Sequence, residues 1–184
     1  LLFDSKKLQV GKGFQCDTWP DIQITDQAKI IIGDNVYFRR NVEVRAHGNS
    51  KVQFEGENRI DRGVRVLGAN DASVKISSGA RIGLCSVLNG GDSIELGKKV
   101  LLSGFVYVQT SMHNFKESGY IQDQGYSHAP VILEDNVWCG AHVVILPGVT
   151  MKSGAIAGSN AVVTQNVEEH QVVVGIPAKP IEKK

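Results

Sequence analysis

Residues able to do acid–base chemistry gather in one stretch of the sequence, residues 111–129, which reads SMHNFKESGYIQDQGYSHA. It holds two of the five histidines, His113 and His128, together with Tyr120 and Tyr126. A neutral imidazole titrates near physiological pH, so it can take a proton from an attacking alcohol or amine. The tyrosines and His128 could line a cleft for the molecule that carries this alcohol or amine, because aromatic rings stack on flat apolar faces. Packing of a surface loop explains them equally well.

This stretch interrupts a six-residue repeat that must position it. From Leu133 the chain reads LEDNVW, CGAHVV, ILPGVT, MKSGAI and AGSNAV, so an apolar residue opens each hexad and a small or β-branched residue stands four places later. The same frame recurs earlier in hexads that open with Ile32, Ile60, Ile76, Ile82, Leu96 and Leu102. A period of six fits neither an amphipathic helix nor a long alternating strand. A β-sandwich would also place Gly and Asn at its turns, but it requires no fixed period.

The repeat therefore predicts a solenoid of short strands. The first residue of each hexad is expected to point into the bore, and Gly, Asn or Asp to turn the corners, where a positive φ costs them little. Stacked coils would bury one continuous apolar column. In this frame Cys139 faces the bore as a small hydrophobic side chain, and Trp138 points outward.

The composition of the chain argues against several classes of binding partner. The chain has 184 residues, 42% of them hydrophobic, which is enough for one domain. Twenty Lys and Arg against 19 Asp and Glu supply no broad field for nucleic acid or an anionic membrane. Three cysteines without C-x-x-C spacing indicate neither a disulfide framework nor a structural zinc site. No signal peptide or membrane-spanning stretch is evident, so a cytoplasmic location without membrane insertion is expected.

The hexads from Leu133 and the closing segment Gly175-Ile-Pro-Ala-Lys179 resemble the hexapeptide-repeat acyltransferases, in the branch of the galactoside, maltose and polysaccharide O-acetyltransferases. The resemblance implies an all-β fold, a left-handed parallel β-helix solenoid with a projecting loop and a short C-terminal extension. Residues 1–170 would form the β-helix acyltransferase domain, with residues 111–129 as its loop insertion. Residues 171–184 would be a tail segment that packs on the coil. A homotrimer with active sites between subunits is also implied.

The same resemblance implies a reaction. Acetyl-CoA would be the co-substrate, no metal is expected, and the acceptor would be a hydroxyl of a sugar or glycan, as in polysaccharide biosynthesis. His113, directly after the coil and at the root of the loop, corresponds to the family's catalytic base in a direct transfer. An activated thioester needs little beyond a positioned base, because holding both substrates together supplies proximity.

Binding residues are carried over by the resemblance as well. Coenzyme A would lie along the terminal coils; the matching positions are Ala141, Gly158, Ser159, Thr164 and Lys179, with Trp138 covering an interface or a cofactor edge. Asn160 and Gln165 depart from the family pattern, and a structural role as corner or coil residues stays open for each position. Asn89 stands where the galactoside enzymes contact sugar, although Asn89-Gly-Gly-Asp92 also reads as a plain turn.

Three other functions remain open. Within the acyltransferases, the acceptor could be the amine of an amino sugar or of a nucleotide-linked amino sugar. A zinc hydratase of the γ-carbonic-anhydrase type shares the predicted helix but needs three converging histidines, and His113, His128 and His142 are widely separated in the sequence. A non-enzymatic solenoid scaffold would need neither the histidine-bearing loop nor the closing segment.

Overall fold

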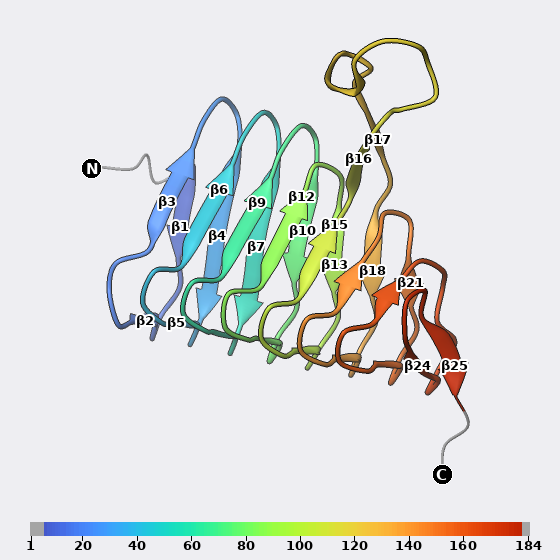
Figure 1. The fold of residues 1–184 in the computed structure, drawn as a ribbon. Helices are drawn as coiled ribbons and strands as arrows, with labels where there is room; N and C mark the ends of the chain where they lie inside the picture. Colours follow the sequence, from blue (N-terminus) through green and yellow to red (C-terminus); the bar gives the residue numbers. More distant parts are fainter. Residues whose placement is uncertain (1–5, 182–184) are drawn as a thin grey trace.

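The computed structural model describes residues 6–181, which form a left-handed parallel β-helix (Figure 1). Three parallel sheets make its three sides. The first contains β1 (Leu8–Val10), β4 (Lys29–Asp34), β7 (Lys51–Gly56), β10 (Ser73–Ile76), β13 (Ile94–Leu96), β18 (Val131–Leu133) and β21 (Thr150–Met151). The second contains β2 (Gln15–Cys16), β5 (Tyr37–Phe38), β8 (Arg59–Ile60), β11 (Arg81–Ile82), β14 (Leu101–Leu102), β19 (Trp138–Cys139), β22 (Ile156–Ala157), β24 (Val172–Val174) and β25 (Lys179–Ile181). The third contains β3 (Asp21–Ile24), β6 (Glu43–Ala46), β9 (Arg65–Gly68), β12 (Val87–Gly90), β15 (Tyr107–Gln109), β20 (Val144–Ile145) and β23 (Val162–Val163).

The bore is the hydrophobic core. Every residue that opens a hexad in the predicted frame is buried: Ile32, Ile60, Ile76, Ile82, Leu96, Leu102, Leu133, Cys139, Ile145, Met151 and Ala157. Burying a side chain such as Ile or Leu stabilises the fold by about 1.5–3 kcal/mol. Phe38 and Phe54 pack edge to face in the wider N-terminal part, with ring centroids 5.0 Å apart. The inward frame predicted from the sequence is confirmed.

Coil length changes along the solenoid. Ile30 pairs with Val52 and Val52 with Val74, so each of these positions marks the start of a new N-terminal coil. Near the C-terminal end Ile145 pairs with Val163, and the coil between them is shorter, only three hexads long. The difference lies in the strands: those of the first sheet shorten from six residues in β4 and β7 to two in β21, and those of the third from four in β6 and β9 to two in β20 and β23. The period of six thus describes the C-terminal coils, whereas the N-terminal coils have longer sides.

The expectation that Asn and Gly turn the corners of the coils is confirmed only in part. Between the second and third sheets, the coils place Asn41, Gly63 and Asn160 at positive φ, as predicted. Phe105 and His142 occupy the same corner with φ of 61° and 59°, a conformation that costs a side chain with a Cβ roughly 1–2 kcal/mol. Their rings stack with centroids 4.8 Å apart and planes 2° apart, which offsets part of that cost.

The C-terminal segment closes the last coil. Strand β24 continues the second sheet parallel to β22, and β25 turns back antiparallel on β24 (Figure 1). The amide of Ala178 donates to the carbonyl of Val162 at 2.8 Å, which ties this segment to the third sheet. The division into domains at residue 170 stays a prediction. Residues 1–5 and 182–184, which belong to the two predicted segments, lie outside the described residues. No helix within residues 6–181 is long and apolar enough to cross a membrane.

Candidate functional site

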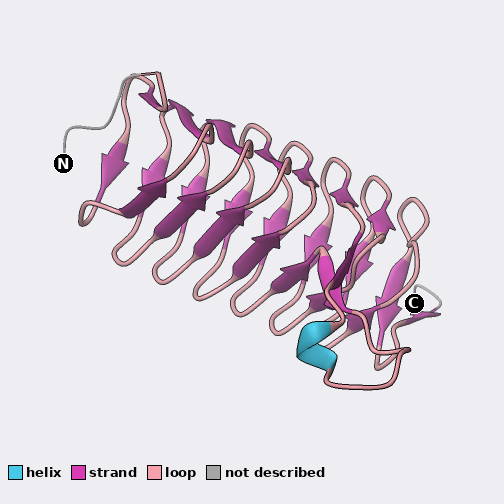
Figure 2. Cartoon of the chain, turned by 90° about the horizontal axis from the view of Figure 1, so that it is seen from above, coloured by secondary structure: helices cyan, strands magenta, loops and turns pink. Residues whose placement is uncertain are grey.

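Residues 111–129 form an arm that rises from the coil between the third and first sheets (Figures 1 and 2). Strands β16 (Ser111–His113) and β17 (Tyr126–His128) pair antiparallel, and a short 3₁₀ helix, η1 (Ile121–Asp123), lies beyond them. Successive residues of a strand point to opposite faces, so Ser111 and His113 share a face with Tyr126 and His128. The two predicted histidines therefore come together on one face of the arm.

His113 and Tyr126 lie directly opposite each other, and their ring centroids are 4.1 Å apart. Next along the ladder, Ser111 Oγ and His128 Nδ1 are 2.8 Å apart, within hydrogen-bonding distance. Tyr126 and His128 are stacked with centroids 6.2 Å apart. His113 is exposed, so its imidazole is open to an incoming group while the ring is held by Tyr126.

The root of the arm is fixed to the coil by Thr110, which is fully buried. Its hydroxyl donates to the carbonyl of Asn89 at 2.9 Å and accepts from the amide of Asp92 at 2.9 Å. Its own carbonyl accepts from the amide of Ala129 at 3.0 Å. These bonds place the first and last residues of the arm in a set position relative to the third sheet.

Asn89 lies in strand β12, so the interpretation of Asn89-Gly-Gly-Asp92 as a plain turn is wrong for its first two residues. Its side chain is half-buried and donates to the hydroxyl of Tyr107 at 3.3 Å. Asn89 is part of a strand because β12 pairs in parallel with β9 on one side and with β15 on the other, both in the third sheet. Asn89 therefore belongs to the coil directly beneath the root of the arm.

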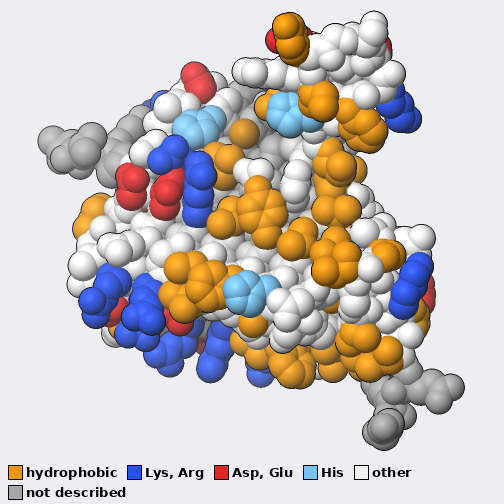
Figure 3. All heavy atoms as spheres, in the orientation of Figure 1, with side chains coloured by type: hydrophobic (Ala, Val, Ile, Leu, Met, Phe, Trp, Pro, Cys, Tyr) orange, Lys and Arg blue, Asp and Glu red, His pale blue; other side chains and the backbone are white. Residues whose placement is uncertain are grey.

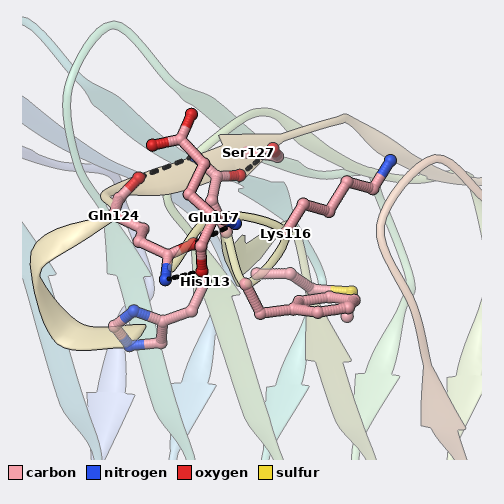
Figure 4. Close-up of a pocket in the computed structure, with 8 residues that line it drawn as sticks. His113, Lys116, Glu117, Gln124 and Ser127 are labelled. Carbon is pink, nitrogen blue, oxygen red and sulfur yellow. Dashed lines mark hydrogen bonds between the residues drawn. The ribbon is translucent and has the colours of Figure 1, made fainter. Parts of the chain in front are cut away.

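Two hollows border the arm. One, about 370 Å³, is formed by the arm itself, and its lining includes His113, Asn114, Lys116, Gln124 and Ser127 (Figure 4). Gln124 Nε2 donates to the carbonyl of Glu117 at 3.0 Å, and Asn114 Nδ2 donates to the carbonyl of Gln124 at 3.0 Å. The polar lining is thus held by hydrogen bonds within the arm.

The second hollow, about 340 Å³, lies between the arm and the corners of earlier coils. His128 lines it together with Asn70, Asp71, Gly91 and Asp92. This hollow offers hydroxyl-binding groups beside the histidine-bearing face. The roles of Ser111, Asn114 and Gln124 were missed from the sequence, because the paired segments Ser111–His113 and Tyr126–His128 are too short to show a strand pattern.

Three of the residues assigned to coenzyme A come together. Ala141 follows β19, and Gly158 and Ser159 follow β22 at the same corner one coil later, where the amide of Asn160 donates to the carbonyl of Ala141 at 2.9 Å. A Cβ on Gly140 would stand 2.6 Å from the amide nitrogen of Ser159. Small residues are therefore required for the coils to meet here.

The other assigned residues are spread out. Trp138 lies in β19, 46% exposed, with its indole nitrogen donating to Ser103 Oγ at 3.3 Å. Thr164 follows β23 at the far end of the third sheet, and Lys179 begins β25. Tyr120 precedes η1 in the outer part of the arm and is 82% exposed. Within one chain these four do not form a single cluster with His113.

Cysteine and metal chemistry can be located as well. Cys139 is fully buried, and burial raises the pKa of its thiol to about 12. This confirms its role as a core residue. Across the described range, 6–181, no group of three or more His, Cys, Asp or Glu side chains is arranged to hold a metal ion.

Comparison with known sequences finds acetyltransferases. No protein-family model matches the chain. A Schizosaccharomyces pombe protein named as an acetyltransferase is 39% identical over 92 residues, covering 49% of this chain and 43% of the relative. A Mycobacterium tuberculosis protein named as an acetyltransferase is 30% identical over 117 residues, covering 63% of this chain and 39% of the relative. The chain thus spans about two fifths of the length of the curated relatives it matches.

Comparison with solved structures supports the fold over the whole chain. A point mutant of AntD, an N-acyltransferase from Bacillus cereus solved with dTDP-4-amino-4,6-dideoxyglucose and coenzyme A, superposes with a TM-score of 0.67 at 21% identity, covering 97% of this chain and 85% of AntD. The polySia-specific acetyltransferase NeuO gives 0.57 at 20% identity, with 96% and 86% covered. A maltose O-acetyltransferase from Clostridium difficile gives 0.53 at 20% identity, with 95% and 68% covered.

Proposed function

We propose that this chain is an acetyl-CoA-dependent O-acetyltransferase that acts on a hydroxyl of a sugar or glycan, with His113 as general base. The observation that carries the proposal is the exposed imidazole of His113, held against Tyr126 at the root of an arm beside two hollows. The acetyltransferase names of the sequence relatives, and the coenzyme A present in the AntD structure, support the choice of donor.

The reaction is a direct transfer. The acceptor oxygen attacks the thioester carbonyl carbon as His113 takes the hydroxyl proton, which gives a tetrahedral oxyanion. Collapse breaks the carbon–sulfur bond, and the protonated His113 returns its proton to the departing thiolate. The products are an acetyl ester and coenzyme A, so atoms and protons balance without a covalent enzyme intermediate. General-base assistance of this kind typically contributes about 10²–10⁴-fold.

Coenzyme A would bind along the corner of Ala141, Gly158 and Ser159. Small side chains there leave backbone groups open to a pantetheine arm. Lys179 would place a cation near the phosphates, Thr164 a hydroxyl, and Trp138 an apolar edge. These residues lie on coils beyond the arm, so a neighbouring copy would complete the site.

A homotrimer with sites between subunits is part of the proposal. Large apolar side chains are exposed on the C-terminal half of the coil, among them Leu101 at 43%, Phe105 at 46% and Trp138 at 46%. Figure 3 shows apolar side chains gathered on the central part of the face that carries the third sheet. A second copy of the chain would cover such surface.

One experiment tests the proposal. Release of coenzyme A from acetyl-CoA is measured over a panel of sugars, glycans and amines, for the wild type, His113→Asn and His170→Asn. His170 is an exposed corner histidine in the left-handed conformation, which Asn tolerates, so it is a matched control. We expect His113→Asn to lower turnover by about 10²-fold or more while coenzyme A still binds. Equal losses in both variants, or no coenzyme A binding by the wild type, would contradict the proposal.

A second candidate is N-acetylation of an amino sugar linked to a nucleotide. It is favoured by the AntD likeness, because AntD is an N-acyltransferase solved with a dTDP-linked amino sugar and 85% of its chain is covered. An amine that attacks as the free base depends less on a general base than a hydroxyl does. Turnover with amines alone, and only a small effect of His113→Asn, would select this function.

A further inference from the structure

Two arginines lie side by side on the outer surface of the second sheet. Arg59 of β8 and Arg81 of β11 are direct partners in the parallel register. Neighbouring strands are about 4.8 Å apart, so the two side chains leave the sheet close together. Like charges placed opposite each other on a sheet are destabilising. The arrangement therefore costs stability unless something anionic lies between or over the two guanidinium groups.

Two nearby acidic residues, Asp17 and Asp61, lie close to a third arginine. Arg39 Nε lies 3.4 Å from a carboxylate oxygen of Asp17 and 4.0 Å from one of Asp61. Arg59 instead lies over the ring of Tyr37, with its guanidinium carbon 5.5 Å from the ring centroid. Among residues 6–181, neither Arg59 nor Arg81 forms an ion pair with a carboxylate. Within residues 6–181 these two guanidinium groups thus have no carboxylate within ion-pair distance.

These two arginines line a groove of about 360 Å³, with Tyr37 at one end and Leu101 at the other. Arg81 also borders a second hollow of about 550 Å³, together with Lys99 and Glu57. The register continues from Arg81 to Leu101 and then to Trp138, two residues that belong to the proposed subunit contact. Figure 3 shows Lys and Arg side chains gathered along the lower left edge of the molecule, away from the arm. Outside the proposed subunit contact, the row thus consists of an aromatic ring followed by two guanidinium groups along the solenoid axis.

We propose that the first part of this row, Tyr37, Arg59 and Arg81, is an accessory binding strip for an acidic glycan, an inference that rests on the proposed glycan transfer. Guanidinium groups bind carboxylates in a planar, bidentate way, and the ring of Tyr37 suits the apolar face of a sugar residue. Double-stranded nucleic acid is disfavoured, because its affinity depends on many phosphate contacts and the chain carries a net charge of only +1.

The strip lies away from the proposed chemistry. The arm leaves the coil between the third and first sheets, so the second sheet occupies the opposite side. A glycan held here contributes binding through sugar residues remote from the reacting hydroxyl. Long acidic acceptors therefore gain affinity from the strip, whereas monosaccharides do not.

The test is calorimetric titration of the whole chain with a hexamer of galacturonic acid and with its methyl ester, which is neutral. The variant is Arg59→Gln/Arg81→Gln. Its matched control is Lys29→Gln/Lys51→Gln, because Lys29 and Lys51 are also in-register cations on neighbouring strands, in the first sheet. We expect the arginine variant to weaken binding of the acid at least tenfold, the lysine variant to leave it within twofold, and the ester to bind weakly to all.

Three results would overturn the inference: equal losses in both variants, binding of ester and acid alike, or equally tight binding of a single-stranded DNA oligonucleotide. A change of oligomeric state in the arginine variant, measured by light scattering, with glycan affinity unchanged would assign the arginines to a subunit contact instead. His113→Asn separates the two proposals, since it should lower transfer by about 10²-fold or more and leave hexamer binding intact. A strip that binds the hexamer in a chain that never binds coenzyme A would refute only the proposed function.

Discussion

The rings of His113 and Tyr126 face each other across the arm, with centroids 4.1 Å apart and planes 37° apart. Small displacements of a catalytic group lower the reaction rate by about 10²-fold. Removal of the Tyr126 ring should therefore lower turnover. We expect Tyr126→Ala to lower kcat by about tenfold or more with little change in KM for acetyl-CoA, and Tyr126→Phe to stay within about twofold, since only the ring contacts His113. Steady-state kinetics of both variants check this. Equal losses would show that the hydroxyl, not the ring, matters.

Gly91 lies against the pair formed by Ser111 and His128. A Cβ at this position would stand 2.1 Å from Ser111 Oγ and 3.3 Å from His128 Nδ1, so Gly91→Ala must displace the serine hydroxyl and break the pair. Ser111→Ala removes the clashing atom. We expect the double variant to be more stable than the sum of the single effects predicts, by about 0.5–3 kcal/mol. Urea unfolding of the four proteins measures this coupling, and strict additivity would contradict the placement of Ser111.

Gly140 is packed against backbone that cannot move aside easily. An added Cβ would stand 2.6 Å from the amide nitrogen of Ser159 and 2.7 Å from its Oγ. Gly140→Ala should cost about 1–3 kcal/mol and weaken coenzyme A binding at the corner. The control is Gly104→Ala, whose Cβ would approach the carbonyl of Leu84 only to 3.3 Å. Thermal unfolding and coenzyme A titration should rank Gly140→Ala as the more damaging change.

The cysteines should differ sharply in reactivity. Cys85 is exposed, whereas Cys139 is buried and its thiol pKa is raised from 9.0 to about 12. At pH 8 a thiol reagent should label Cys85 quickly and Cys139 only after unfolding, because the thiolate is the reactive form. Mass spectrometry of the labelled protein identifies the sites, and rapid labelling of native Cys139 would contradict its burial.

The same shift makes a prediction for alkaline stability. Burial favours the neutral thiol, so the folded pKa lies above the unfolded one, and the stabilisation is present below pH 9.0 and lost as the pH rises toward about 12. Cys139→Ala should therefore flatten the decline of unfolding free energy over this range. Urea titrations at several pH values, for both proteins, measure the slopes. Parallel declines would exclude the thiol as a cause.

Much of the fold could be predicted because the buried residues recur at a fixed spacing in the sequence. Hexads place one apolar side chain on each side of a coil, and Leu133, Cys139 and Ile145 show this directly. The greater length of the N-terminal coils was not predicted, since longer strands such as Lys51–Gly56 alternate in and out and so hide the extra residues within the same apolar spacing. The corner positions of Phe105 and His142 were not predicted either, because neither residue is of a type that favours a positive φ.

The site was predictable only as a region. The break in the repeat located the arm and its histidines, because a segment without the hexad pattern cannot contribute to the bore. Its pairing of Ser111 with His128, and the anchoring by Thr110, depend on contacts between residues far apart in the sequence, which no local pattern records. The role of His113, the coenzyme A contacts and the trimer stay predictions, since each involves a molecule other than this chain.

The change in coil length also bears on how the protein could be shortened or lengthened. Each coil contacts mainly the coils before and after it, so excising one whole repeat leaves two matching cross-sections to meet. In the N-terminal half such a cut must remove one long coil, for example from Ile30 in β4 up to its partner Val52 in β7. A cut of three hexads suits only the C-terminal half, where Ile145 pairs with Val163. The repeat that can be removed or inserted as a unit is therefore longer before the arm and shorter after it.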